Sequence, residues 1–91
     1  MASDEIELDF IGSGAVINVG SRVAVRDALL WGLDPENTQR IAGRQVQIFC
    51  NDPAVAAALA WALKALLPLG QWAVNGRAVT LTPSLKERKG A

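Results

Sequence analysis

The sequence predicts an α+β fold, a two-layer sandwich in which an antiparallel sheet carries two helices on one face. Segments with the two-residue alternation of strands come in pairs near both ends of the chain. Two segments with helical patterns lie between these pairs. Hydrophobic residues make up 51% of the 91 residues, which is enough to build the core of one small domain. The expected topology is ferredoxin-like or a related split β-α-β arrangement.

The first two strands are predicted from an alternating segment, a glycine turn and a β-branched segment. Apolar Ile6, Leu8 and Phe10 alternate with acidic Glu5, Glu7 and Asp9. Residues 12–14, Gly-Ser-Gly, supply a turn, because glycine adopts positive φ without steric cost. Ile17 stands where a dinucleotide-binding fingerprint would need its third glycine, so we expect a hairpin turn and no bound cofactor. Residues 15–19 form the partner strand.

A helix is expected over residues 22–31, with Ser21 as its N-cap and Gly32 just beyond its end. Its buried stripe would consist of Val25, Ala28 and Leu29. The β-branched residues in this segment weaken the helix, so a longer second strand is the alternative.

Residues 34–43 allow two interpretations. Asp34 followed by Pro35 is typical of a helix start and predicts a short helix over residues 35–42. Alternatively, residues 37–41 could pair with the strand that follows. That strand, residues 44–50, places Val46, Ile48 and Cys50 on one face.

The final third of the chain contains a helix and a hairpin. Asp52 and Pro53 start an alanine-rich helix over residues 53–67. Asn75-Gly76 predicts a type I′ turn between two short strands. The domain therefore spans residues 1–83, and the charged residues 84–91 are expected to be a disordered tail.

Composition disfavours most enzyme chemistry. The chain has no His and one Cys, so it offers no imidazole base, no internal disulfide and no four-ligand zinc set. We therefore expect a protein that is not an enzyme and that binds neither metal nor cofactor. The acidic N-terminus and the single cysteine favour a cytoplasmic location. The alanine-rich segment of residues 53–70 is too short and too weakly hydrophobic for a membrane span.

Two alternative functions depend on particular residues. A thiol enzyme would use Cys50 just before a helix N-terminus, although Asp52 occupies that helix dipole. A nucleic-acid-binding accessory protein would use five arginines: Arg22, Arg26, Arg40, Arg44 and Arg77. Nine Lys and Arg balance nine Asp and Glu, and this zero net charge disfavours nucleic acid as a partner.

The most informative segment is the helix over residues 53–67, which is apolar on every side. Its core stripe would be Val55, Leu59, Ala62, Leu63, Leu66 and Leu67. Its opposite face would be Ala54, Ala57, Ala58, Trp61 and Ala65, which we call the alanine-tryptophan face. This face needs a cover, either from the neighbouring helix and the hairpins of the chain itself, with the short segment at residues 35–42 as the first candidate, or from another molecule. The sequence thus predicts an interaction module that forms a homodimer or larger oligomer, or binds another protein.

Overall fold

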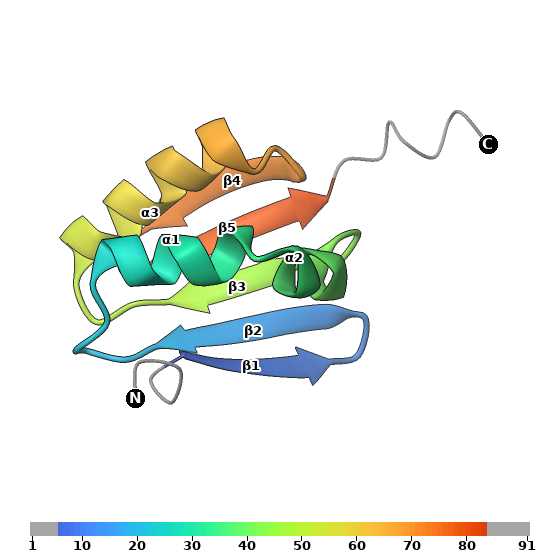
Figure 1. Cartoon of the computed structure of the whole chain (residues 1–91), viewed down its shortest axis with the longest axis horizontal. Coiled ribbons are helices and arrows are strands. Elements are labelled where there is room, and N and C mark those ends of the chain that lie inside the picture. Colours follow the sequence, from blue (N-terminus) through green and yellow to red (C-terminus); the bar gives the residue numbers. More distant parts are fainter. Residues whose placement is uncertain (1–5, 84–91) are drawn as a thin grey trace.

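The chain places its two terminal hairpins at opposite edges of one sheet, with a short strand between them. A computed structural model describes residues 6–83, and the predicted charged tail of residues 84–91 lies outside them. The elements in chain order are β1 (Ile6–Ile11), β2 (Gly14–Val19), α1 (Val25–Leu33), α2 (Pro35–Ile41), β3 (Val46–Phe49), α3 (Pro53–Leu66), β4 (Gly70–Asn75) and β5 (Ala78–Pro83) (Figure 1).

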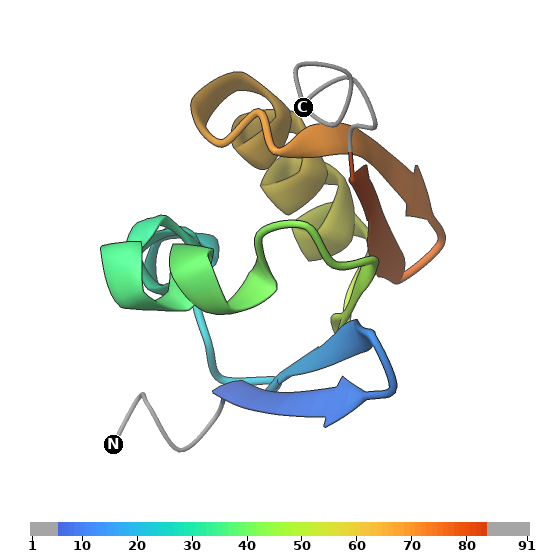
Figure 2. The same ribbon diagram turned by 90° about the vertical axis from the view of Figure 1, so that its right-hand side faces the viewer.

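The structure confirms the α+β sandwich, with all helices on one face of the sheet (Figure 2). The sheet order is β1-β2-β3-β5-β4, and the sheet is mixed rather than antiparallel throughout, because β2 and β3 run parallel. The connection between these two strands contains α1 and α2, and a helical crossover of that length permits parallel pairing. β3, α3 and β4 form a split β-α-β unit, with β5 inserted between the two strands.

Both hairpins turn at a glycine with positive φ. Asn75 pairs with Ala78, so the central residues of the second turn are Gly76 and Arg77. Gly76 has a φ of +61°, and no residue other than glycine has positive φ between residues 6 and 83. A glycine with positive φ at the first central position defines a type II′ turn. The predicted hairpin is therefore confirmed. The predicted turn is wrong in its position and its type: the central residues are Gly76 and Arg77 instead of Asn75 and Gly76, and the turn is type II′ instead of type I′. Gly12 occupies the same position in the first hairpin, with a φ of +60°.

The predicted alternation along the strands is confirmed by burial. Val46, Ile48 and Cys50 are buried against the helices, whereas Gln47 and Phe49 are exposed on the open face of the sheet. The sheet side of the core contains apolar residues from every strand: Ile6, Ala15, Ile17, Val19, Val46, Ile48, Trp72, Val79 and Leu81. No helix among the described residues is long and apolar enough to cross a membrane.

The first helix differs from its predicted bounds. α1 begins after Ala24 rather than after Ser21, and its N-cap makes no side-chain hydrogen bond. Residues 20–23 instead form a turn, in which the Val23 amide donates to the Gly20 carbonyl at 3.2 Å and the Val23 side chain is buried. Val23 is β-branched, and such side chains favour a helix little. Its burial in the turn therefore explains why α1 begins later than predicted. At the other end, Gly32 lies inside α1 rather than beyond it.

Residues 35–41 are helical, which settles the alternative left open by the sequence. The Asp34 side chain accepts a hydrogen bond from the Glu36 amide at 2.9 Å, and Pro35 occupies the first position of α2. Side chains of α2 also satisfy the carbonyl groups that end α1. Asn37 Nδ2 donates to the Trp31 carbonyl at 2.9 Å, and Thr38 Oγ1 donates to the Gly32 carbonyl at 3.1 Å.

Candidate interaction surface

Hydrogen bonds fix α3 at both ends. Asp52 Oδ1 accepts from the Ala54 amide at 2.8 Å, as expected for an N-cap, and Pro53 follows it. At the other end, Trp72 Nε1 of β4 donates to the Leu67 carbonyl at 2.8 Å. Since Trp72 is itself buried, this bond satisfies a helix-end carbonyl and ties α3 to β4. The orientation of α3 about its own axis is thus set by the core.

The buried side of α3 is turned slightly from the predicted stripe. Its buried residues are Ala56, Leu59, Ala60 and Leu63, with Val55, Ala62 and Leu67 half-buried. Leu66 was expected in the stripe but is 58% exposed. The buried positions recur every three to four residues, from Ala56 and Leu59 through Leu63 to Leu67. Because the buried side chains of Ala56 and Ala60 are small, α3 can pack closely on the sheet in this orientation.

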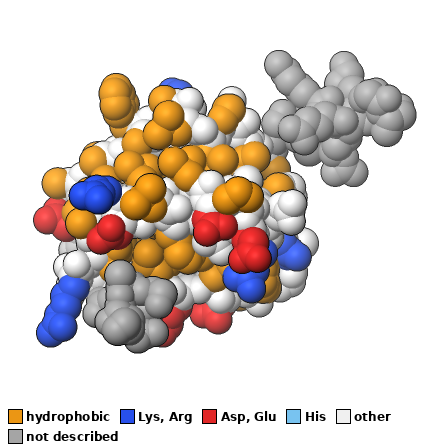
Figure 3. Space-filling model, in the orientation of Figure 1, with side chains coloured by type: hydrophobic (Ala, Val, Ile, Leu, Met, Phe, Trp, Pro, Cys, Tyr) orange, Lys and Arg blue, Asp and Glu red, His pale blue; other side chains and the backbone are white. Residues whose placement is uncertain are grey.

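The alanine-tryptophan face of α3 is exposed in all five of its residues: Ala54, Ala57, Ala58, Trp61 and Ala65. Trp61 is the most exposed large hydrophobic side chain of the described residues, at 78%. Lys64 is the only charged residue of the helix. Hydrophobic side chains accordingly cover much of the helical side of the molecule, where α3 and α1 lie (Figure 3). The alternative that residues 35–42 cover this face is wrong, because α2 leaves it open and instead buries Ile41 in the core.

One exposed leucine that the sequence did not single out lies on α1. Leu30 is 58% exposed, while Ala28 of the same helix is buried. The helical repeat turns position 30 away from the side occupied by Ala28 and Gly32. A helical wheel drawn with the correct helix start could have found it, but a single exposed leucine is common on protein surfaces. It adds apolar area to the helical side of the molecule.

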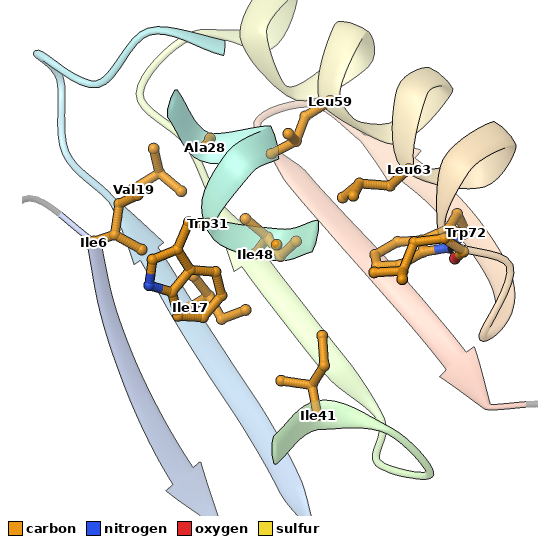
Figure 4. A pocket seen from close by; sticks show the side chains of 12 residues that line it. Ile6, Ile17, Val19, Ala28, Trp31, Ile41, Ile48, Leu59, Leu63 and Trp72 are labelled. Carbon is orange, nitrogen blue, oxygen red and sulfur yellow. Dashed lines mark hydrogen bonds between the residues drawn. The ribbon is translucent and has the colours of Figure 1, made fainter. Parts of the chain in front are cut away.

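The described part of the chain contains a small apolar cavity in its interior. This cavity lies between the helices and the sheet, has a volume of about 20 Å³ and is lined by apolar side chains, among them Trp31, Ile41, Leu63 and Trp72 (Figure 4). That volume is about what one water molecule needs, but a buried water also needs polar partners, which this lining lacks. The cavity is a packing defect, far below the several hundred Å³ of a typical ligand pocket.

Cys50 follows β3 and is buried, with its backbone amide donating to the Arg77 carbonyl at 2.9 Å. Desolvation by burial raises the pKa of the Cys50 thiol above its ordinary value. A thiol with a raised pKa stays protonated near neutral pH and is a poor nucleophile. Asp52, which caps the next helix, removes the electrostatic help that the helix N-terminus could give.

The five arginines do not form one patch. Arg22 and Arg26 lie at the end of the sheet where β2 and β3 finish, and Arg77 is in the hairpin turn at the same end. Arg40 and Arg44 lie at the opposite end, where the Arg44 guanidinium stacks over the ring of Phe10 at 4.5 Å. A nucleic-acid backbone would need a continuous basic track. The arrangement therefore does not strengthen the nucleic-acid alternative.

The acidic strand face includes Glu7 and Asp9, which lie on the open side of the sheet; Glu5 is outside the described residues. Between residues 6 and 83, no three potential metal-ligating side chains come together.

Comparisons with protein families, with functionally characterised proteins and with solved structures give no match. The surface that most needs an explanation is thus the alanine-tryptophan face.

Proposed function

We propose that this chain is a non-catalytic assembly module that self-associates through the alanine-tryptophan face of α3. The observation that carries the proposal is the exposure of Trp61, at 78%, in the middle of a row of exposed alanines. Large exposed apolar patches on folded domains mark interaction sites. The proposal rests on this one surface.

The shape of the face suits a second copy. A tryptophan is a large anchor with little conformational entropy to lose, and the alanines beside it are small enough to receive the anchor of a partner. In a symmetric dimer the same face meets itself, so each Trp61 can pack on the alanines of the partner's α3. Ala54, Ala58 and Ala65 follow one another on Trp61's side of the helix.

The area that a stable interface needs is a modest part of the molecular surface. A stable interface buries about 800 Å² per partner, roughly an eighth of this chain's 5972 Å². A tryptophan side chain can bury about 150–250 Å², so Trp61 alone offers a substantial share. Leu30 of α1 and Leu66 at the end of α3 are further exposed apolar side chains among the helices.

The test places a charge at the centre of the face. Ala58→Glu would bury an unpaired carboxylate in the interface, at a cost of about 3 kcal/mol or more, which raises the dissociation constant at least about a hundredfold. Light scattering after size-exclusion chromatography should show an oligomer for the unmodified chain and a monomer for Ala58→Glu. Circular dichroism should show the same helical content in both.

Gln39→Glu is the matched control, because it adds the same charge at an exposed position of α2. It should leave the oligomer intact. A monomeric unmodified chain at several hundred micromolar would overturn the proposal. So would an Ala58→Glu variant that stays oligomeric.

A further inference from the structure

The two free edges of the sheet differ in charge. β1 and β4 are the outermost strands. β1 contains Glu7 and Asp9, whereas β4, with the sequence Gly-Gln-Trp-Ala-Val-Asn, contains no charged residue. Charges on an edge strand oppose pairing with another chain, because they would have to lose their water. β1 is thus protected in a way that β4 is not.

β4 also lacks the other common protections of an edge. It contains no proline, and it pairs with β5 residue for residue from Gly70 to Asn75 without a bulge. Gln71, Ala73 and Val74 are exposed. On the side away from β5, no strand of the described residues borders β4, so alternate backbone N–H and C=O groups of this edge are free to pair.

Helix α3 and the free edge of β4 lie at the same border of the molecule. Figure 1 shows α3 and β4 together at the border farthest from β1. The bond from Trp72 Nε1 to the Leu67 carbonyl joins the two elements directly. A partner that covers α3 from this side therefore also meets the edge of β4.

We propose that β4 pairs antiparallel with β4 of a second copy about a twofold axis, which joins two five-stranded sheets into one of ten strands. This inference rests on the proposed self-association and specifies its geometry. The same axis sets the two α3 helices side by side and antiparallel, so that their dipoles oppose each other favourably. The alanine-tryptophan face then supplies the apolar contact that two paired strands alone lack.

The charge pattern of the edges selects this arrangement. Pairing β4 with β4 brings no like charges together, whereas pairing β1 with β1 would set Glu7 and Asp9 against the same residues of the partner. Head-to-tail pairing of β1 with β4 would leave a free edge at each end and build an open filament. Only the β4 pair closes into a dimer without opposed charges.

Ala73→Lys tests the edge separately from the helix face. Position 73 is exposed near the middle of β4, so two paired strands would bring two lysine side chains onto neighbouring strands. The dissociation constant should rise about tenfold or more, as measured by analytical ultracentrifugation. Gln47→Lys is the control, since it adds the same charge to the same open face of the sheet on the central strand β3, and it should change nothing.

Hydrogen exchange gives a second, independent measurement. The β4 amides should exchange slowly in the unmodified dimer and at least about tenfold faster in monomeric Ala58→Glu, while the β3 amides change little. If Ala58→Glu dissociates the dimer but Ala73→Lys does not and the β4 amides stay unprotected, the edge inference is wrong and the proposed function stands. A monomeric unmodified chain would overturn both. Oligomers that grow beyond dimers with concentration would overturn the closed arrangement.

Discussion

Gly32 lies inside α1, where glycine weakens a helix, so replacing it with alanine should stabilise the protein. Glycine in a helix costs about 0.5–1 kcal/mol relative to alanine. A Cβ atom at position 32 would meet Leu63 Cδ2 of α3 at 3.5 Å, which is an ordinary van der Waals contact. The change therefore requires no movement of α3.

The added methyl group is buried, because Gly32 itself is buried and borders the small apolar cavity. Burying one such group contributes about 0.8 kcal/mol. The separate gain in helix propensity is small, because position 32 is close to the end of α1. Together these effects predict a gain of about 1 kcal/mol in the free energy of unfolding. For a domain of this size that gain raises Tm by about 4–8 °C.

Thermal denaturation followed by circular dichroism at 222 nm measures this shift, at one protein concentration for all variants. Gly43→Ala is the matched control, because Gly43 has a φ of +78° and a Cβ atom added there would have no neighbour within 4 Å. There the same substitution adds only backbone strain, of about 1–2 kcal/mol, and Tm should fall. A lower Tm for Gly32→Ala would refute the reasoning, since it would mean that α1 and α3 tolerate no side chain between them.

Two further substitutions test the hairpin turn and the buried thiol. Gly76→Val forces a β-branched residue to a φ of +61°. It should lower the free energy of unfolding, measured by urea denaturation, by about 1–3 kcal/mol. An unchanged midpoint of denaturation would contradict the type II′ turn. Cys50→Ser should cost about 1–2 kcal/mol through a poorly satisfied buried hydroxyl, without loss of self-association. Because burial raises the Cys50 pKa, the unfolded chain loses this proton first, so stability should fall as the pH rises past the ordinary value of 9.0. Cys50→Ser should lack that fall, and a parallel pH dependence in both proteins would count against burial of the thiol.

The sequence predicted those elements whose signals are local. Alternation of Val46, Ile48 and Cys50 marked the buried side of β3, and Asp52 with Pro53 marked the start of α3. The five residues of the alanine-tryptophan face share the side of α3 that faces away from the core, as their spacing predicts. These features depend on spacing within one element, which a single sequence displays directly.

The errors arise where distant contacts decide the structure. The parallel pairing of β2 with β3 depends on how the α1–α2 crossover returns to the sheet, and no residue in either strand encodes it. Ser21 is a good N-cap by residue type, but burial of Val23 places the N-cap at Ala24 and the helix start at Val25. The uncharged edge of β4 became visible only once the strand order placed β4 at the border of the sheet.

The central position of β3 has a consequence for how the molecule opens. Among residues 6–83, its four residues, Val46–Phe49, are the only link within the sheet between the β1–β2 hairpin and the β4–β5 hairpin. Each hairpin is contiguous in sequence and closes around a two-residue turn, so each can form early and by itself. β3 must instead wait for two long chain closures, one on each side. Partial unfolding can therefore detach either hairpin as a unit, whereas exposing β3 on both sides requires the whole sheet to come apart.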